Sequence, residues 1–179
     1  FTIAVHYKSR QLEEKMPDPW DKGFSSIITK ELNNKKQNEY GNSPWNLGFF
    51  VDNELHWFGP AAYAEIITSA PAEQPAKIFF VDALQTKYQT IKQLNWQTKF
   101  SSFQHILSSR KKLKFSQFKD DATWFYQQMA DQYYKTCRQA VKAVFPNHLY
   151  LGSRLHGDAN SIVLRAAEKH SDVISYNLY

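Results

Sequence analysis

The chain contains one cysteine, Cys137, among its 179 residues. A single thiol excludes an intrachain disulfide and any metal site built from several cysteines. Cys137 falls on the apolar face of an expected helix, which predicts a buried and inert thiol rather than a nucleophile. The histidines also lack the close spacing of a zinc motif, so we expect no metal site. This holds for four of the six histidines: His56, His148, His156 and His170.

Long apolar runs, internal repeats and glycine-rich phosphate loops are missing as well. No window approaches the roughly 18 apolar residues that a membrane-spanning helix needs, so we expect no membrane partner. The chain begins Phe-Thr-Ile-Ala-Val without an initiator Met and ends within apparent regular structure. Both ends therefore look cut, and we expect a piece of a longer protein.

The charge is positive but weakly clustered. A net charge of +5 and a pI near 9.2 suit nucleic-acid binding. The only dense basic cluster, Arg110 to Lys114, also reads as a solvated loop. We therefore predict no nucleic-acid partner; steeply salt-dependent binding of an oligonucleotide would revive that hypothesis.

The sequence is rich enough in apolar and aromatic residues to form a buried core. Hydrophobic residues make up 42% of the chain and aromatic residues 16%. At this length we expect a single domain, residues 1–179. The aromatic content suits sugar-stacking clefts and a large core equally well.

The pattern along the chain alternates strands and helices. The run Leu47 to Val51 is too short for a typical helix and reads as a strand buried on both faces. The alternation implies parallel strands joined by crossovers. The expected helices span 21–35, 61–68, 83–94, 121–145 and 161–170, and the other expected strands 1–5, 148–152 and 172–179.

Polar side chains lie at or just after the ends of three successive expected strands. In a (β/α)8 barrel such strand ends converge on one face. An open doubly wound sheet also gathers ligands at strand ends, but it usually carries a glycine-rich phosphate turn. The pattern favours a partial barrel with an insertion after the Leu47–Val51 strand. The residue pairs are Asn53 and Glu54, Arg154 and His156, and Asn177 and Tyr179.

Asn53 and Glu54 carry the sharpest chemical hypothesis. A carboxyl group at the tip of a buried strand, beside His56 and Trp57, can have its pKa raised by desolvation and act as a general acid. The neighbouring amide can hold a sugar hydroxyl. The other reading is a polar strand exit whose side chains cap the following turn. Spacing alone does not separate the two.

A family resemblance supports the catalytic reading. Gly-Phe-Phe-Val-Asp-Asn-Glu-Leu-His-Trp resembles the acid/base strand of clan A glycoside hydrolases, whose fourth barrel strand ends in Asn-Glu. More closely, the chain resembles the β-agarases, whose barrel is related to the β-galactosidases of that clan. Four further segments agree in order, over most of the chain: 16–21, 87–96, 148–154 and 172–179.

The resemblance implies a segment covering about strands 3 to 6 of a retaining glycoside hydrolase that acts on agarose-type galactans. Glu54 matches the general acid/base and Asn53 its sugar-orienting neighbour. The implied chemistry needs no cofactor and takes place outside the cytoplasm, secreted or periplasmic. The remaining expected substrate-binding residues are His56, Trp57, Trp96, Arg154, His156, Asn177 and Tyr179.

Several alternatives stay open at this stage. Trp96 suits a sugar platform or packing, Arg154 and His156 suit substrate or structural bonds, and Asp18 suits sugar contact or helix capping. The clan's nucleophile is a Glu after the seventh strand, beyond this chain, so we expect the segment to be inactive alone. A β-galactosidase-type exoglycosidase and a non-catalytic carbohydrate-binding barrel are the competing functions, and the oligomeric state is undetermined.

Overall fold

The strand β4 (Gly48–Val51) lies at the centre of a three-stranded parallel sheet. Its neighbours are β1 (Thr2–Val5) and β5 (Leu149–Tyr150), in the order β1-β4-β5. All four β4 residues are buried, as predicted, but Leu47, which was also expected in this buried strand, precedes β4 and is 57% exposed. The computed structural model describes residues 1–157 and 159–179. Within them, the predicted α/β class with parallel strands is confirmed.

Close backbone approach explains the glycine that opens β4. A Cβ atom at Gly48 would lie 2.2 Å from the carbonyl oxygen of Leu149 on the neighbouring strand. That distance is far inside van der Waals contact, so a side chain there would push β4 and β5 apart. The register pairs Gly48 with Leu149 and Phe49 with Tyr150.

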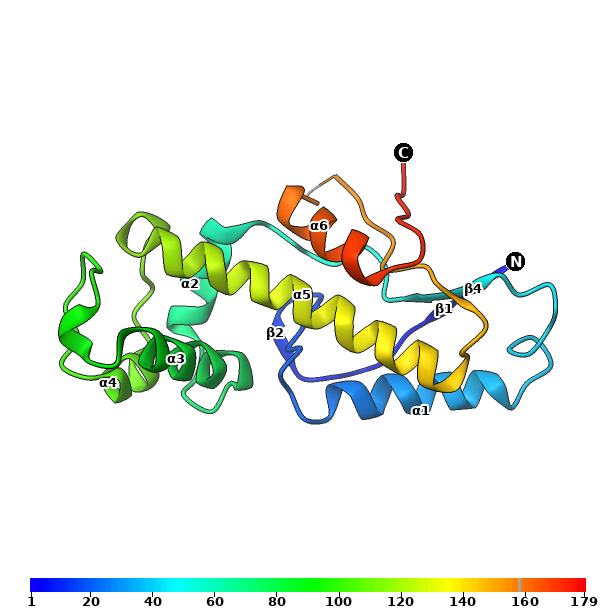
Figure 1. Cartoon of the computed structure of the whole chain (residues 1–179), viewed down its shortest axis with the longest axis horizontal. Helices are drawn as coiled ribbons and strands as arrows, with labels where there is room; N and C mark the ends of the chain where they lie inside the picture. The colour runs from blue at the N-terminus through cyan, green and yellow to red at the C-terminus, as the bar shows by residue number, and fades with distance from the viewer. Residues whose placement is uncertain (158) are drawn as a thin grey trace. The chain divides into compact units, whose positions relative to one another are not determined.

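The described residues form two compact units (Figure 1). Unit 1 comprises Phe1–Trp57 and Ala130–Tyr179, and unit 2 comprises Phe58–Met129. The long helix α5 (Lys119–Val144) contains the boundary between them. The sheet belongs to unit 1.

Helices of unit 1 bury apolar stripes at helical spacing. The helix α1 (Phe24–Lys36) buries Phe24, Ile28 and Leu32. The helix α6 (Ser161–His170) starts at Asn160, whose side chain accepts hydrogen bonds from the backbone N–H groups of the first turn. The α5 residues Tyr133, Cys137 and Val141 are fully buried, so the predicted stripe and the buried thiol are confirmed.

Two features of unit 1 differ from the sequence prediction. The polar passage after β1 forms a small antiparallel pair, β2 (Gln11–Glu13) and β3 (Met16–Pro17). The stretch 172–179 is not a strand but makes one isolated parallel bridge, Leu155 to Tyr176. Val173 and Ile174 are exposed there.

Unit 2 is helical. Its elements are α2 (Pro60–Ser69), α3 (Pro75–Tyr88), η1 (Ile91–Gln93), α4 (Phe103–Ser108), η2 (Phe115–Gln117) and the start of α5. The expected helix 83–94 was placed too late. Pro75 occupies the first turn of α3, where a missing N–H group is harmless, and Gln89, with a φ of 58°, ends the helix.

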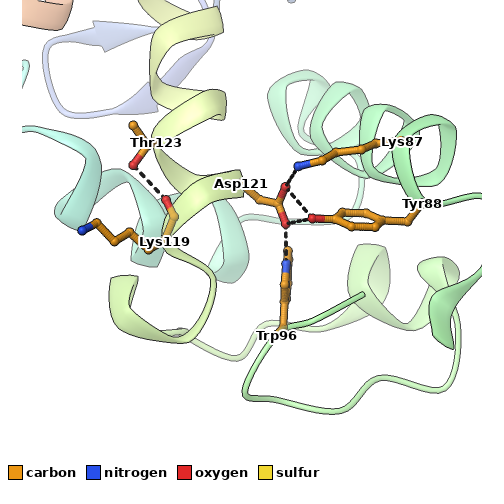
Figure 2. Close-up of polar contacts among 6 residues, drawn as sticks. All are labelled: Lys87, Tyr88, Trp96, Lys119, Asp121 and Thr123. Atoms are coloured by element: carbon orange, nitrogen blue, oxygen red, sulfur yellow. Dashed lines mark hydrogen bonds and ion pairs between the residues drawn. The ribbon is translucent and has the colours of Figure 1, made fainter. Parts of the chain in front are cut away.

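Buried polar anchors hold unit 2 together. Asp121, in the first turn of α5, accepts hydrogen bonds from Lys87 and Tyr88 at the end of α3 and from the Trp96 indole N–H at 2.6 Å (Figure 2). The buried Lys77 ammonium donates to the carbonyl oxygens of Thr68 and Ala70, and burial lowers its pKa to about 8.

None of the helices in the described part of the chain is long and apolar enough to cross a bilayer. Across the same residues, no three His, Cys, Asp or Glu side chains gather as a metal site would require.

Candidate functional site at the strand ends

The sheet of unit 1 continues past its named strands and brings three chain segments together. The Glu54 N–H donates to the Arg154 carbonyl at 2.9 Å, and Asn53 bridges to Arg154 in parallel. The Leu155 N–H donates to the Ser175 carbonyl at 2.9 Å, and the Asn177 N–H donates back to the Leu155 carbonyl at 2.8 Å. The carboxyl ends of three parallel segments therefore meet at one edge.

Five side chains from these segments form one hydrogen-bonded group, here called the strand-end cluster: Asn53, Glu54, Arg154, Asn177 and Tyr179. Glu54 Oε1 accepts a hydrogen bond from Asn177 Nδ2 at 2.6 Å and another from the Tyr179 hydroxyl. Asn53 Oδ1 lies 3.4 Å from Arg154 Nη1 and 3.5 Å from Asn177 Nδ2. The Arg154 guanidinium also lies 4.5 Å from the centre of the Phe50 ring. Residues predicted from three separate stretches thus lie together.

The charge environment of Glu54 differs from the prediction. Hydrogen bonds from Asn177 and then Tyr179 lower the pKa of Glu54, and the nearby charges of His156 and Lys15 lower it further. The sequence predicted that desolvation would raise it. The Glu54 side chain keeps solvent access and its donors favour the carboxylate form, so desolvation is the weaker effect here. Within this chain, Glu54 is a carboxylate at neutral pH.

Both donors bind the same oxygen of Glu54. Asn177 and Tyr179 converge on Oε1, and no described residue is seen to donate a hydrogen bond to Oε2. A proton on Glu54 is therefore held more readily on Oε2, the oxygen with fewer hydrogen-bond donors. This geometry suits a carboxyl group that gives a proton to a bound molecule.

Left-handed backbone conformations surround Asn53. Asp52 has a φ of 65° and Glu54 a φ of 53°. Non-glycine residues in this region cost about 1–3 kcal/mol each, and such strain concentrates at functional sites. The chain therefore turns sharply directly after β4 and aims Asn53 and Glu54 at the edge of the sheet.

The Asp52 carboxyl group is held in a separate, interior set of contacts. Its Oδ2 accepts hydrogen bonds from the Tyr7 hydroxyl and, at 2.8 Å, from the Tyr133 hydroxyl. Burial raises the pKa of Asp52 to about 6, against the opposite effect of the two tyrosine hydrogen bonds. Asp52 thus faces the core while its two successors face the sheet edge.

Aromatic residues expected to stack on a sugar lie elsewhere. Trp57 is 1% exposed, with its ring stacked on Tyr134. Trp96 is 7% exposed and belongs to unit 2, where its indole nitrogen binds Asp121. Packing therefore covers both Trp57 and Trp96.

The remaining predicted residues are placed less centrally. His56 is half-buried and follows Glu54 by two positions. His156 acts on Glu54 through its charge. Asp18 is fully buried and its Oδ1 accepts a hydrogen bond from the Trp20 N–H. This local turn precedes α1, whose first turn follows Gly23 without a side-chain cap, so Asp18 does not cap the helix as expected.

Sequence reasoning missed four residues around this site: Lys15, Asp52, Tyr7 and Tyr133. Lys15 lies in the turn between β2 and β3, a pair that the sequence did not predict. Tyr133 falls on the apolar face of an expected helix and Tyr7 in the polar passage after the first strand, and their shared acceptor is visible only in three dimensions. Asp52 adjoins the Asn-Glu pair, which is a signal that could have singled it out.

Comparison with known proteins gives consistent matches, although no family model matches the chain. β-Agarase B of Vibrio sp. (strain JT0107) is 33% identical over 176 residues, covering 90% of this chain. The crystal structure of an agarase, AgWH50C, covers 100% of this chain at 30% identity with a TM-score of 0.84. A β-galactosidase from Halorubrum lacusprofundi, at 14% identity, covers 92% of this chain with a TM-score of 0.60, which shows likeness of fold alone.

The matches cover nearly all of this chain but only a small part of each relative. The chain spans 18% of the length of β-agarase B, 28% of the AgWH50C chain and 24% of the β-galactosidase chain. The sequence match to β-agarase B covers 90% of this chain, and the structural match to AgWH50C covers 100% of it. Over nearly its whole length, the chain is therefore similar to one segment of the β-agarases, which are glycoside hydrolases.

Proposed function

We propose that the chain is part of the catalytic (β/α)8 barrel of a retaining β-agarase, with Glu54 as the general acid/base. The observation that carries this proposal is the strand-end cluster. It joins an Asn-Glu pair to donors from two neighbouring parallel segments, in a chain similar along its length to agarases. Residues 1–179 supply about strands 3 to 6 of one incomplete catalytic domain, and unit 2 is the insertion after strand 4.

The proposed reaction has two steps. In the first, the protonated Glu54 gives its proton to the glycosidic oxygen as the bond from that oxygen to the anomeric carbon breaks. A second carboxylate, supplied from outside this chain, bonds to the same carbon. In the second step, Glu54 takes a proton from water as the water oxygen displaces that carboxylate. The sugar leaves with its original anomeric configuration.

Each member of the cluster has a proposed role. The Asn53 amide orients the sugar hydroxyl beside the reacting carbon, as Arg154 and Asn177 hold its oxygen in place. Asn177 and Tyr179 fix Glu54 through Oε1, leaving Oε2 to face the leaving oxygen. His156 and Arg154 add positive charge and hydrogen-bond donors for the galactan hydroxyls.

The acid role requires a source of negative charge near Glu54. Its neighbours in this chain lower its pKa, whereas a general acid at neutral pH needs a raised one. A second carboxylate about 5 Å away, as retaining enzymes have, raises the pKa of the first by repulsion. The proposed nucleophile therefore also raises the pKa of Glu54, which allows Glu54 to act as a general acid. Because galactans lie outside the cell, we propose a secreted or periplasmic enzyme.

Replacing Glu54 with Gln in the full-length enzyme tests the proposal. We expect kcat/KM for an agarose oligosaccharide to fall at least about 100-fold, since its leaving alcohol needs a proton. A nitrophenyl glycoside leaves without that proton, so its kcat/KM should change little. The control is Glu168→Gln on the exposed face of α6, which should leave both values unchanged. Equal loss on the two substrates would refute the acid role.

Substrate range separates agarase from the β-galactosidase alternative. Rates should rise from simple β-galactosides to agarose oligosaccharides if a polysaccharide cleft surrounds the cluster. The opposite order would support a β-galactosidase-type exoglycosidase. Binding of agarose without any turnover would support the carbohydrate-binding alternative.

A further inference from the structure

Asp52 ties together three elements of unit 1. Its carboxylate follows β4, Tyr7 follows β1 and Tyr133 lies on α5, and both hydroxyls donate to the same Asp52 oxygen. Its backbone N–H donates to the Val5 carbonyl at 3.2 Å. Asp52 is therefore bound on one side by its side chain and on the other by its backbone.

Tyr133 links that carboxylate to the end of the strand. Its hydroxyl lies 3.0 Å from the Val51 carbonyl oxygen and 2.8 Å from Asp52 Oδ2. One hydroxyl hydrogen is thus shared between the last residue of β4 and the first residue of the turn. The hydroxyl fixes the peptide at which the backbone enters the left-handed conformation.

Tyr133 also packs against the chain segment that follows Glu54. Its ring meets the Trp57 ring edge to face with centroids 5.6 Å apart. Trp57 stacks on Tyr134 at 5.7 Å. The residues from 52 to 57 are consequently anchored before Glu54 by a hydrogen bond and after it by a packed ring. Fully buried aromatic rings hold such anchors rigidly.

We propose that Asp52 is a positioning residue of the active site: held by Tyr7 and Tyr133, it fixes the left-handed turn that presents Asn53 and Glu54 to the substrate. Asp52 contacts neither sugar nor nucleophile in this proposal and acts through its two successors. The inference rests on the proposed function. The geometry explains why a buried carboxyl group stands directly before the Asn-Glu pair.

The test compares two substrates in Asp52→Asn and Tyr133→Phe variants of the full-length enzyme. A displaced acid transfers its proton poorly, and a misplacement of about 1 Å costs on the order of 100-fold in rate. We expect kcat/KM for an agarose oligosaccharide to fall about 10- to 100-fold in each variant. For a nitrophenyl glycoside, which needs no proton, the loss should be at least about 5-fold smaller.

Tyr134→Phe is the matched control. Tyr134 is the next residue of α5, is equally buried, and its hydroxyl bonds to Ser153 at 2.9 Å instead of to Asp52. Its loss should affect both substrates in the same proportion. In a Glu54→Gln background, Asp52→Asn should add no further selectivity between the substrates, because the proton donor is already gone.

The outcomes separate this inference from the function on which it rests. Wild-type rates in Glu54→Gln on the oligosaccharide would overturn the proposed function, whatever Asp52 does. Selective loss in Glu54→Gln together with equal losses on both substrates in Asp52→Asn would leave the function standing. That result would overturn only the positioning role, since a general loss of folded enzyme lowers both rates alike.

Discussion

At the scale of single residues, the site consists of hydrogen-bond donors and acceptors arranged around the Glu54 carboxylate. Glu54 Oε1 takes two hydrogen bonds, and Asn53 Oδ1 lies between Arg154 and Asn177. These contacts keep the Glu54 charge stable in this chain. Substitutions within the strand-end cluster should therefore change the pKa of Glu54.

Tyr179→Phe should raise the pKa of Glu54. Tyr179 is the second donor to this carboxylate after Asn177, so its removal weakens the charged form. Because the acid must be protonated, the basic limb of the kcat/KM profile should move to higher pH in the full-length enzyme. The neighbouring Tyr176→Phe is the control and should leave the limb in place. A limb that moves to lower pH in Tyr179→Phe would contradict this account.

At the scale of elements, hydrogen bonds from buried charges hold helix ends and loops together. Asp121 joins the start of α5 to the end of α3 and to the segment that carries Trp96 (Figure 2). Its side chain is 3% exposed, whereas Asp120 beside it is exposed. Both aspartates lie in the first turn of α5 and meet the same helix dipole.

The two aspartates offer a matched comparison of stability. Asp121→Ala should lower the free energy of unfolding by about 3 kcal/mol, because it leaves the buried Trp96 N–H and the Tyr88 hydroxyl without their acceptor. Asp120→Ala should change it by less than about 0.5 kcal/mol. Urea unfolding of the full-length protein, followed at the transition that includes unit 2, measures both. Equal effects would show that the helix dipole, not the hydrogen bonds, is responsible.

At the scale of the whole molecule, the sequence predicted the parallel α/β class and most helices because periodicity and buried runs report local burial. The prediction placed α3 late, whereas the structure starts this helix at Pro75, whose missing N–H group is harmless in a first turn. It brought Asn53, Arg154 and Asn177 together because strand ends converge. It could not find the Asp52 contacts with Tyr7 and Tyr133, or the inward turn of Trp57, since these depend on packing between distant elements.

Stability of the folded chain should depend on pH through Asp52. Its folded pKa of about 6 lies above the ordinary value of 3.8, so the folded state binds the proton more tightly. The favourable contribution is present below about pH 4 and is lost as the pH rises through about 6. It amounts to at most about 3 kcal/mol. The titratable groups that act on or respond to Asp52 are His6, Tyr7, Tyr133, Cys137 and Tyr150.

Urea unfolding from about pH 4 to about pH 7, compared between the wild type and Asp52→Asn, measures this dependence. The wild type should lose more stability across the range than the variant, because the amide side chain introduced by the substitution cannot ionise. Parallel curves would mean that Asp52 titrates in the folded state as it does in the unfolded chain.

The most direct measurement of the Glu54 assignment is chemical rescue of Glu54→Ala in the full-length enzyme. The substitution removes the carboxylate, so a small anion such as azide can enter the vacated space and attack the glycosyl-enzyme without a general base. With a nitrophenyl β-glycoside, azide should raise kcat at least about 10-fold and yield the β-glycosyl azide, which has the configuration of the substrate. An α-glycosyl azide would identify Glu54 as the nucleophile instead, and the absence of any rescue or azide product would contradict its acid/base role.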